Sequence, residues 1–213
     1  MKPFKTHRGI IAPLDRSNVD TDQIIPKQFL KSIARTGFGP QLFFDWRYLA
    51  DGKAANPDFE LNKSRYKGAS ILVTRNNFGC GSSREHAVWA IAQDGYKVVV
   101  APWRQSGRDR IPAFADIFRN NSFKNALLTI ELSEEEVDEI FQTVERYPGL
   151  EATANVDEQR LTLHLPEEIS FHFDLDKAVK ERLLHGLDDI GLSLQQEAKI
   201  TEYEKTHHAQ RMW

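Results

Sequence analysis

Cysteine is almost absent from this chain of 213 residues, in which Cys80 is the single one. One thiol excludes an internal disulfide and is typical of a protein from a reducing compartment. It also excludes an iron–sulfur cluster held by this chain alone, because such clusters normally take about four cysteine ligands. No Cys-x-x-Cys or His-Glu-x-x-His pair occurs, so we expect no metal site in this chain.

Long apolar runs and an excess of charge are lacking as well. No window approaches the roughly 18 apolar residues that a membrane helix requires, and residues 1–9 lack the apolar stretch of a signal peptide. The net charge is −3, so the chain has no basic surface of the kind that binds nucleic acid. We therefore expect a cytoplasmic protein that contacts neither membrane nor nucleic acid.

The length and the 40% apolar content are sufficient for one sizeable core. We expect a single domain over residues 1–213, with residues 160–213 as a candidate extension. Apolar runs predict strands at residues 8–13, 69–74, 97–101 and 127–132, and alternation predicts a hairpin from 161–165 and 169–173. Helices are expected at residues 29–34, 84–94, 114–123, 134–146, 176–185 and 193–208. Residues 51–65 and 103–111 are expected to be surface loops.

A strand, a glycine turn, a helix and a second strand follow one another between residues 69 and 101. This order makes one βαβ unit, so the sheet is at least partly parallel and the fold class is α/β. Polar residues predict several helix ends. The expected pairs are Ser133 with Glu136, Asp176 with the stop at Gly186, and Ser193 with Gln196.

The segment that carries chemistry runs from Gly79 to Ala87, with the sequence Gly-Cys-Gly-Ser-Ser-Arg-Glu-His-Ala. Its glycines allow a sharp turn and let a ligand approach the backbone amides. The start of the following helix leaves free N–H groups, and Arg84 adds a guanidinium that matches a carboxylate. Together these features predict an anion site. A purely structural alternative stays open, because Ser82 and Glu85 fit a capping box.

Three familiar glycine motifs do not fit this turn. A phosphate-binding loop requires a lysine that is missing, and the dinucleotide fingerprint requires a third glycine where Arg84 stands. A nucleophile elbow requires glycine two residues after the serine, and Arg84 or Glu85 occupies that position. The histidines offer no partner for His86 at ligand spacing, and His164 and His172 of the expected hairpin are interpreted as structural.

These residues resemble a known family. Gly81-Ser-Ser-Arg-Glu-His-Ala87 is similar to the serine motif in the swivelling domain of aconitase-type hydro-lyases, and Asp20-Thr-Asp-Gln-Ile-Ile-Pro26 resembles the second signature of that domain. Further blocks resemble the small subunits of bacterial 3-isopropylmalate dehydratases and are spread over nearly the whole chain. They lie at residues 35–39, 43–47, 114–118 and 188–192.

The resemblance implies a swivelling β/β/α domain with a mixed sheet, followed by the C-terminal hairpin and helices. It also implies a partner, the large subunit, which would carry a [4Fe-4S] cluster that this chain does not bind. The two subunits would interconvert 2-isopropylmalate and 3-isopropylmalate in leucine biosynthesis. Ser82 would be the base that removes the proton next to a carboxylate, and Asp22 would join it in the wall of the active site. Ser83 and Arg84 would hold a carboxylate of the hydroxy-acid substrate.

The stretch after Pro26 corresponds to the part that tunes substrate choice in this family. Phe29, Leu30 and Lys31 would lie there, with the two apolar side chains facing an isopropyl group, and Arg35 would reach a distal carboxylate. Ordinary core packing is the alternative for Phe29 and Leu30, and a solvated surface charge is the alternative for Arg35.

Two other functions remain open at this point. The same scaffold could serve another hydroxy acid, such as citramalate, homocitrate or citrate, or it could be a carboxylate-binding module without catalysis. The sequence also departs from the family in two places. Residues 103–112 form a longer connection than the family's join, and Ser122 stands where a cysteine is often found.

Overall fold

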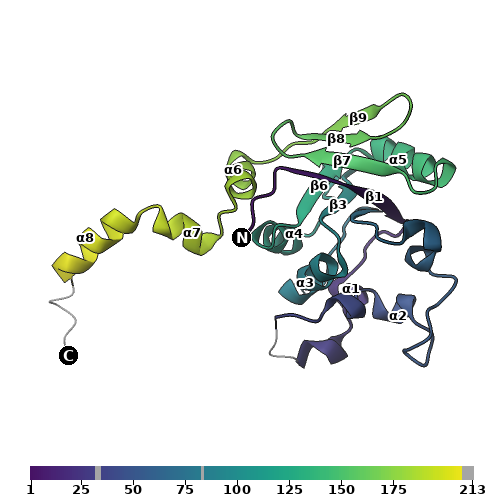
Figure 1. Ribbon diagram of the computed structural model, residues 1–213, viewed down its shortest axis with the longest axis horizontal. Helices are drawn as coiled ribbons and strands as arrows, with labels where there is room; N and C mark the ends of the chain where they lie inside the picture. Colours follow the sequence, from purple (N-terminus) through teal and green to yellow (C-terminus); the bar gives the residue numbers. More distant parts are fainter. Residues whose placement is uncertain (32–34, 83, 208–213) are drawn as a thin grey trace.

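The computed structural model describes residues 1–31, 35–82 and 84–207. A seven-stranded mixed sheet forms its centre, with the strand order β6-β3-β2-β1-β7-β8-β9 (Figure 1). The strands are β1 (Thr6–Leu14), β2 (Ile71–Thr74), β3 (Val98–Pro102), β6 (Leu128–Leu132), β7 (Glu151–Asn155), β8 (Arg160–Leu163) and β9 (Ile169–His172). The first four are parallel to one another, and β7, β8 and β9 continue the sheet in antiparallel pairing. The predicted α/β class with a mixed sheet is confirmed.

Helices cover both faces of the parallel half of the sheet. The helices α3 (Glu85–Asp94) and α4 (Asp116–Lys124) lie together on one face, and α5 (Glu134–Arg146) packs against β1, β2 and β3 on the other (Figure 1). Every residue of β2 and β3 is therefore buried. Central parallel strands that are covered on both faces have continuous apolar sequences, and for this reason both strands could be predicted from the sequence.

Short helices connect the first two strands, and three further helices end the chain. The connection contains α1 (Thr21–Ile24), α2 (Phe44–Arg47) and the 3₁₀ turns Lys27–Lys31, Gly39–Gln41, Glu60–Asn62 and Ser64–Tyr66. The C-terminal helices are α6 (Lys177–His185), α7 (Asp189–Leu194) and α8 (Glu197–His207), and the last two extend away from the sheet (Figure 1). The helix expected at residues 29–34 is a 3₁₀ turn up to Lys31, and residues 32–34 lie outside the described residues. The expected loop 51–65 contains the 3₁₀ turn Glu60–Asn62 and the start of the turn Ser64–Tyr66.

Two of the expected helix ends are confirmed by their hydrogen bonds. Ser133 and Glu136 form a complete capping box at the start of α5. Asp176 accepts from two backbone amides at the start of α6, and Gly186 ends that helix in the left-handed conformation. The cap predicted from Ser193 and Gln196 is wrong, because Ser193 lies inside α7 and its hydroxyl donates to the carbonyl of Asp189 (3.0 Å).

The exposed position expected for residues 103–111 is confirmed, but these residues form a two-stranded hairpin and not a loop. Its strands are β4 (Arg104–Ser106) and β5 (Asp109–Ile111), and the turn between them contains Gly107 with a φ of 61°. Short polar strands with charged side chains on both faces show no alternation of apolar and polar residues, so the hydrophobic pattern of the sequence does not indicate them.

The strand β7 is also absent from the sequence-based prediction. Its sequence, Glu-Ala-Thr-Ala-Asn, has low β-propensity, and the segment is extended because it pairs with β1.

A histidine at the start of the sheet makes the stability of the fold depend on pH. Burial, aided by the charge of Lys97, lowers the pKa of His7 below its ordinary value of 6.5. The ring is hydrogen-bonded to the Ser70 hydroxyl (2.8 Å). Because folding lowers this pKa, the unfolded chain takes up a proton that the folded chain does not bind, and stability falls as the pH drops through 6.5.

We expect the free energy of unfolding in urea to decrease for the wild-type chain between about pH 7.5 and about pH 5.5. The His7→Gln variant lacks the titrating group and should show a smaller decrease over the same interval. Equal decreases in the two proteins would assign the pH dependence to other groups.

Candidate active site

The candidate site lies where β1 and β2 end, at one edge of the parallel strands. The register pairs Leu14 with Thr74, so the segments that follow the two strands emerge side by side. Backbone hydrogen bonds then join the two segments: Gly79 N–H donates to the Val19 carbonyl (2.8 Å), and Thr21 N–H donates to the Cys80 carbonyl (3.0 Å). Two segments about 60 residues apart in the sequence thus form one surface.

Gly79 allows the serine turn to pack against α4. Its φ is 75°, and an added Cβ would lie 2.3 Å from the ring of Phe118. A side chain at this position would therefore be strained by the backbone conformation and would also collide with the buried ring.

We expect Gly79→Ala to lower the free energy of unfolding by about 3 kcal/mol, from backbone strain and overpacking together. Gly149→Ala is the matched control, because Gly149 has a φ of 79° and nothing within 4 Å of its added Cβ. That variant should lose only the backbone part, about 1 kcal/mol. The two variants can be compared by urea unfolding, and equal losses would show that contact with Phe118 contributes nothing.

Ser82 is an exposed residue on this turn. The backbone carbonyl of Ser82 accepts a hydrogen bond from the Thr21 hydroxyl (3.0 Å), which fixes the turn from the neighbouring segment. The capping box of Ser82 and Glu85, which was the structural alternative for this turn, does not form. Helix α3 begins at Glu85, its N-cap is Arg84, and the Arg84 side chain makes no capping hydrogen bond. Capping therefore does not account for Ser82. Ser83 lies outside the described residues.

Arg84 and Asp22 come together although 62 residues separate them. The Arg84 guanidinium donates through Nη1 to the Asp22 carboxylate, and Lys27 Nζ lies 3.1 Å from the other carboxylate oxygen. Asp22 is held there by the short helix α1, in which Asp20 and Gln23 form a complete capping box. The predicted site residues Ser82, Arg84 and Asp22 are thus gathered at one corner.

The charges at this corner keep Asp22 ionised. Burial alone would raise its pKa, but hydrogen bonds and charges from Lys27 and Arg84 outweigh burial and place the pKa below the ordinary value of 3.8. A carboxyl with a lowered pKa keeps its ion pair at neutral pH and loses it only as the pH falls through the folded value. Asp22 therefore does not titrate in the neutral range.

Lys27 is a residue of this corner that the sequence motifs did not indicate. Its position directly after the Ile-Pro ending of the Asp22 segment is the signal that could have found it. Cys80, in contrast, behaves as a small turn residue. Burial, followed by the charge of Asp20, raises the pKa of its thiol, so the thiolate form is disfavoured.

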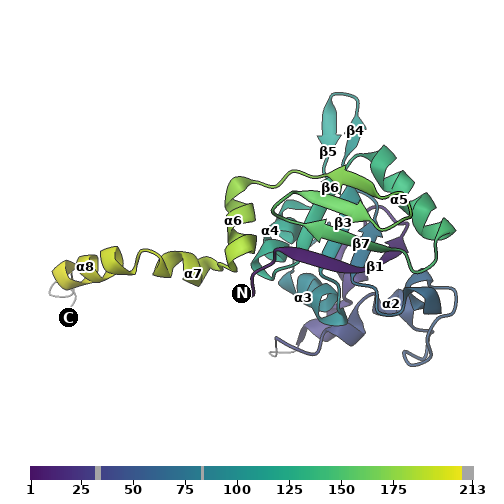
Figure 2. The same ribbon diagram turned by 45° about the horizontal axis from the view of Figure 1, so that its top comes forward.

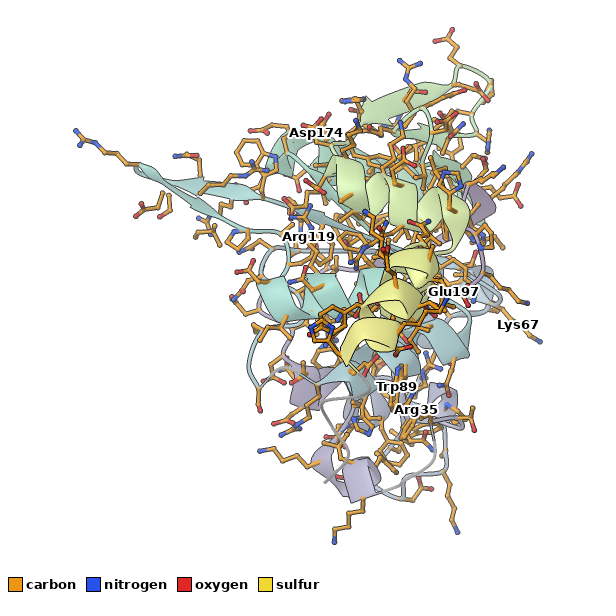
Figure 3. All side chains as sticks on the ribbon, turned by 90° about the vertical axis from the view of Figure 1, so that its left-hand side faces the viewer. Arg35, Lys67, Trp89, Arg119, Asp174 and Glu197 are labelled. Atoms are coloured by element: carbon orange, nitrogen blue, oxygen red, sulfur yellow. The ribbon has the colours of Figure 1, made fainter. Side chains whose placement is uncertain are left out.

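The residues expected to select the substrate lie beyond α1. Phe29 and Leu30 are half-buried and pack against the core, and the ring of Phe29 meets that of Phe44 edge-on at 4.9 Å. Lys31 is exposed. The guanidinium of exposed Arg35 lies 5.9 Å from the ring centre of Trp89 on α3, and Figure 3 shows the two side by side. The contacts recorded for Arg35 are thus with α3 and not with the serine turn.

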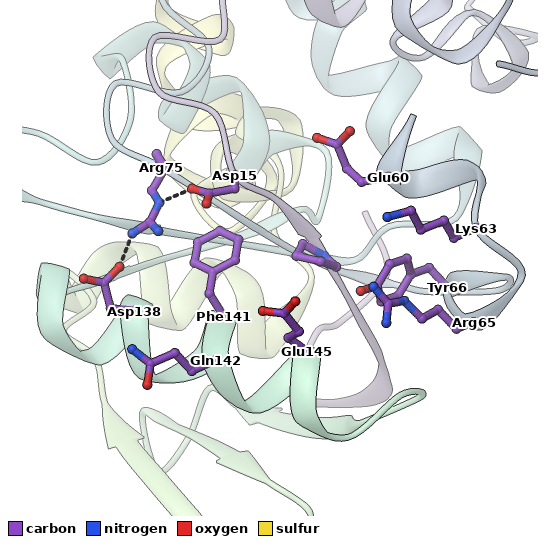
Figure 4. Close-up of a pocket in the computed structure, with 11 residues that line it drawn as sticks. Asp15, Glu60, Lys63, Arg65, Tyr66, Arg75, Asp138, Phe141, Gln142 and Glu145 are labelled. Carbon is purple, nitrogen blue, oxygen red and sulfur yellow. Dashed lines mark hydrogen bonds and ion pairs between the residues drawn. The ribbon is translucent and has the colours of Figure 1, made fainter. Parts of the chain in front are cut away.

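A separate pocket lies between the first connection and α5 (Figure 4). Arg75 lines one end of it, donates to both Asp15 and Asp138, and lies over the ring of Phe141 at 4.3 Å. A cation satisfied by two carboxylates and a ring is typical of a structural link, so we assign this pocket no part in the chemistry.

No group of three or more histidine, cysteine, aspartate or glutamate side chains that could hold a metal ion occurs among the residues described. Within the same residues, no helix is long and apolar enough to cross a membrane.

Comparison with known proteins identifies the family. The sequence model of the aconitase C-terminal domain matches residues 1–135, and the model of the C-terminal domain of the 3-isopropylmalate dehydratase small subunit matches residues 189–213. A 3-isopropylmalate dehydratase small subunit from Desulforapulum autotrophicum is 59% identical over 96% of this chain and 95% of its own length. The chain belongs to the family of 3-isopropylmalate dehydratase small subunits. Membership in a family of small subunits implies a heteromeric enzyme with a large subunit.

A solved structure shares the fold. The crystal structure of a 3-isopropylmalate dehydratase from Methanocaldococcus jannaschii superimposes with a TM-score of 0.60 and covers 93% of this chain and 99% of its own. Its sequence identity is 21%, so this likeness bears on the fold alone. Gly81–Ala87 and Asp20–Pro26, the two segments that resemble motifs of the family, meet at the corner of Ser82, Arg84 and Asp22.

Proposed function

We propose that this chain is the part of a hydro-lyase that interconverts 2-isopropylmalate and 3-isopropylmalate through 2-isopropylmaleate, a step of leucine biosynthesis. The observation that carries the proposal is the exposed Ser82 on a turn beside the ion-paired Arg84 and Asp22. Full-length similarity to a named small subunit supports the same substrate class.

Ser82 acts in this proposal as the base that takes the proton from the carbon next to a substrate carboxylate. A serine hydroxyl is a weak base in water, so its alkoxide requires nearby donors and cations in a site closed to solvent. Arg84 and Lys27 supply the positive charge, and the start of α3 supplies backbone N–H groups. The electrons of the broken C–H bond form the double bond as the hydroxyl leaves the neighbouring carbon as hydroxide. In the hydration step hydroxide adds back, and the Ser82 hydroxyl returns the proton to carbon.

Arg84 holds a substrate carboxylate together with Ser83. The contact with Asp22 uses Nη1, and a guanidinium carries five N–H donors, so donors remain for a second carboxylate. Asp22 fixes the guanidinium in place before substrate arrives. A pre-positioned donor loses less conformational entropy on binding than a free side chain does.

The site in this chain is incomplete by itself. One cysteine cannot supply the ligands of an iron–sulfur cluster, so we place the [4Fe-4S] cluster on the large subunit, where it provides Lewis-acid chemistry. The large subunit also closes the exposed corner and excludes water. Phe29, Leu30, Lys31 and Arg35 lie on the connection after Asp22 and would line the substrate side chain's pocket.

Reconstitution tests this function directly. The chain is mixed with a cluster-loaded large subunit and assayed with isopropylmalate, citraconate and citrate in parallel. Turnover of isopropylmalate that requires both subunits is the expected result. Activity of the isolated chain would contradict the shared site, and turnover restricted to citraconate or citrate would favour a related hydro-lyase of the same scaffold. Substrate binding without turnover of any of the three would favour a non-catalytic module.

A further inference from the structure

The β4–β5 hairpin stands on the same edge of the sheet as the candidate active site. Leu14 pairs with Thr74, Val73 with Val100, and Pro102 with Leu132, so the parallel strands end along one edge. The hairpin begins directly after β3 at that edge, while the serine turn follows β2. A protein that covers Ser82 therefore lies next to the hairpin.

The base of the hairpin is hydrogen-bonded to the serine turn. Asn77 N–H donates to the Pro112 carbonyl (3.2 Å), and Phe78 N–H donates to the Ala113 carbonyl (2.9 Å). Ala115 N–H in turn donates to the Phe78 carbonyl (3.0 Å). The end of the hairpin thus forms one short backbone pairing with the segment that leads to Ser82.

The outer part of the hairpin is exposed and carries an excess of positive charge. Figure 2 shows it extending from the body of the chain. All of β4 and the tip with Arg108 are exposed, and Asp109 is the one acidic residue against three arginines. Arg104 and Arg110 reach Glu134 (3.8 Å) and Glu131 (3.4 Å) at the base, whereas Arg108 lies at the turn.

Isolated two-stranded ribbons are marginally stable in water. Here the Arg110 guanidinium lies 4.6 Å from the ring centre of Trp103 at the base, and the Gln105 side-chain amide donates to the Gly107 carbonyl (2.9 Å) at the turn. A polar ribbon held rigidly at its base and extended into solvent suits contact with another protein.

We propose that the β4–β5 hairpin is a docking arm that binds an acidic patch on the large subunit through Arg104 and Arg108. This inference rests on the proposed function, because it requires the large subunit to close over the corner of Ser82. The hairpin touches the rim of that interface, where charged contacts mainly set the association rate and its dependence on salt. The base of the hairpin is hydrogen-bonded to the backbone of Asn77 and Phe78, so binding of the hairpin would also restrain the segment that leads to Ser82.

The test measures the affinity of the full chain for a cluster-loaded large subunit by biolayer interferometry, at low and at high salt. Arg108→Glu should raise the Kd about tenfold at low salt, mainly through slower association, because a like charge now faces the acidic patch. Arg104→Glu/Arg108→Glu should raise it further. Arg160→Glu is the matched control: it reverses an exposed arginine on β8, in the antiparallel half of the sheet, and should leave the Kd unchanged.

The outcomes separate this inference from the proposed function. A wild-type chain that fails to bind the large subunit would overturn both. Wild-type binding with an Arg108→Glu affinity within about twofold of it would overturn only the docking arm. Concentration-dependent self-association of the wild-type chain that Arg108→Glu abolishes would assign the hairpin to a second copy of this chain and would likewise overturn it.

Discussion

Ser82→Ala in the reconstituted heteromer is expected to lower kcat about 1,000-fold, with little change in the thermal midpoint or in affinity for the large subunit. General-base catalysis contributes roughly 100- to 10,000-fold in enzymes, so loss of the base removes a factor of this size. Ser82 is an exposed residue and is not the N-cap of α3, so removal of its hydroxyl costs little folding stability. The substitution should therefore lower the turnover rate without lowering the stability of the protein.

Ser17→Ala provides the control for this substitution. Ser17 is an exposed serine in the segment after β1, at the same edge of the sheet, and lies outside the corner of Ser82, Arg84 and Asp22. Its removal should leave kcat within about twofold of wild type. A Ser82→Ala enzyme that retained most of its turnover would contradict the role of Ser82 as base.

Arg84→Lys is expected to raise KM roughly 10- to 100-fold, because a charge-assisted hydrogen bond is worth about 1.5–3 kcal/mol. Lysine keeps the charge but loses the planar fork that matches a carboxylate. The ion pair with Asp22 can still form, so the fold and the complex should persist. The change is measured from the substrate dependence of the reconstituted enzyme.

Arg8→Lys is the matched control for the loss of a guanidinium. Arg8 donates to Glu151 through Nε and Nη2 (2.8 and 2.6 Å) at an exposed position on β1. The same substitution there should leave KM unchanged. If Arg84→Lys also left KM unchanged, Arg84 would have no part in substrate binding, and its pairing with Asp22 would be structural.

Some elements of the fold could be predicted from the sequence because residues close together in the chain determine them. The buried strands β2 and β3 are continuous apolar runs, and the capping box of Ser133 and Glu136 depends on residues three positions apart. The features that were missed depend on partners far away in the sequence. Strand β7 forms because β1 offers an edge for pairing, and its own residues carry little signal.

In the candidate site, too, the features set by neighbouring residues could be predicted, and those set by distant partners could not. The anion-binding character of the serine turn follows from glycine, serine and arginine in succession, and family resemblance pointed to Asp22. The direct ion pair between Arg84 and Asp22, and the presence of Lys27 beside it, follow only from the docking of two segments on adjacent strand ends. At Ser82 the local pattern also allowed a capping box with Glu85, and the folded chain does not form it.

Delivery of hydrogen to the substrate carbon tests the central claim most directly. The heteromer is incubated with the alkene 2-isopropylmaleate in deuterium oxide, where the Ser82 hydroxyl exchanges its proton for deuterium before the alkene binds, and deuterium next to the carboxylate of the hydrated product is followed by nuclear magnetic resonance. The wild-type enzyme should introduce deuterium, whereas the Ser82→Ala enzyme should bind substrate and introduce almost none. Deuterium incorporation at the wild-type rate without the Ser82 hydroxyl would contradict the assignment of Ser82 as the proton-abstracting base.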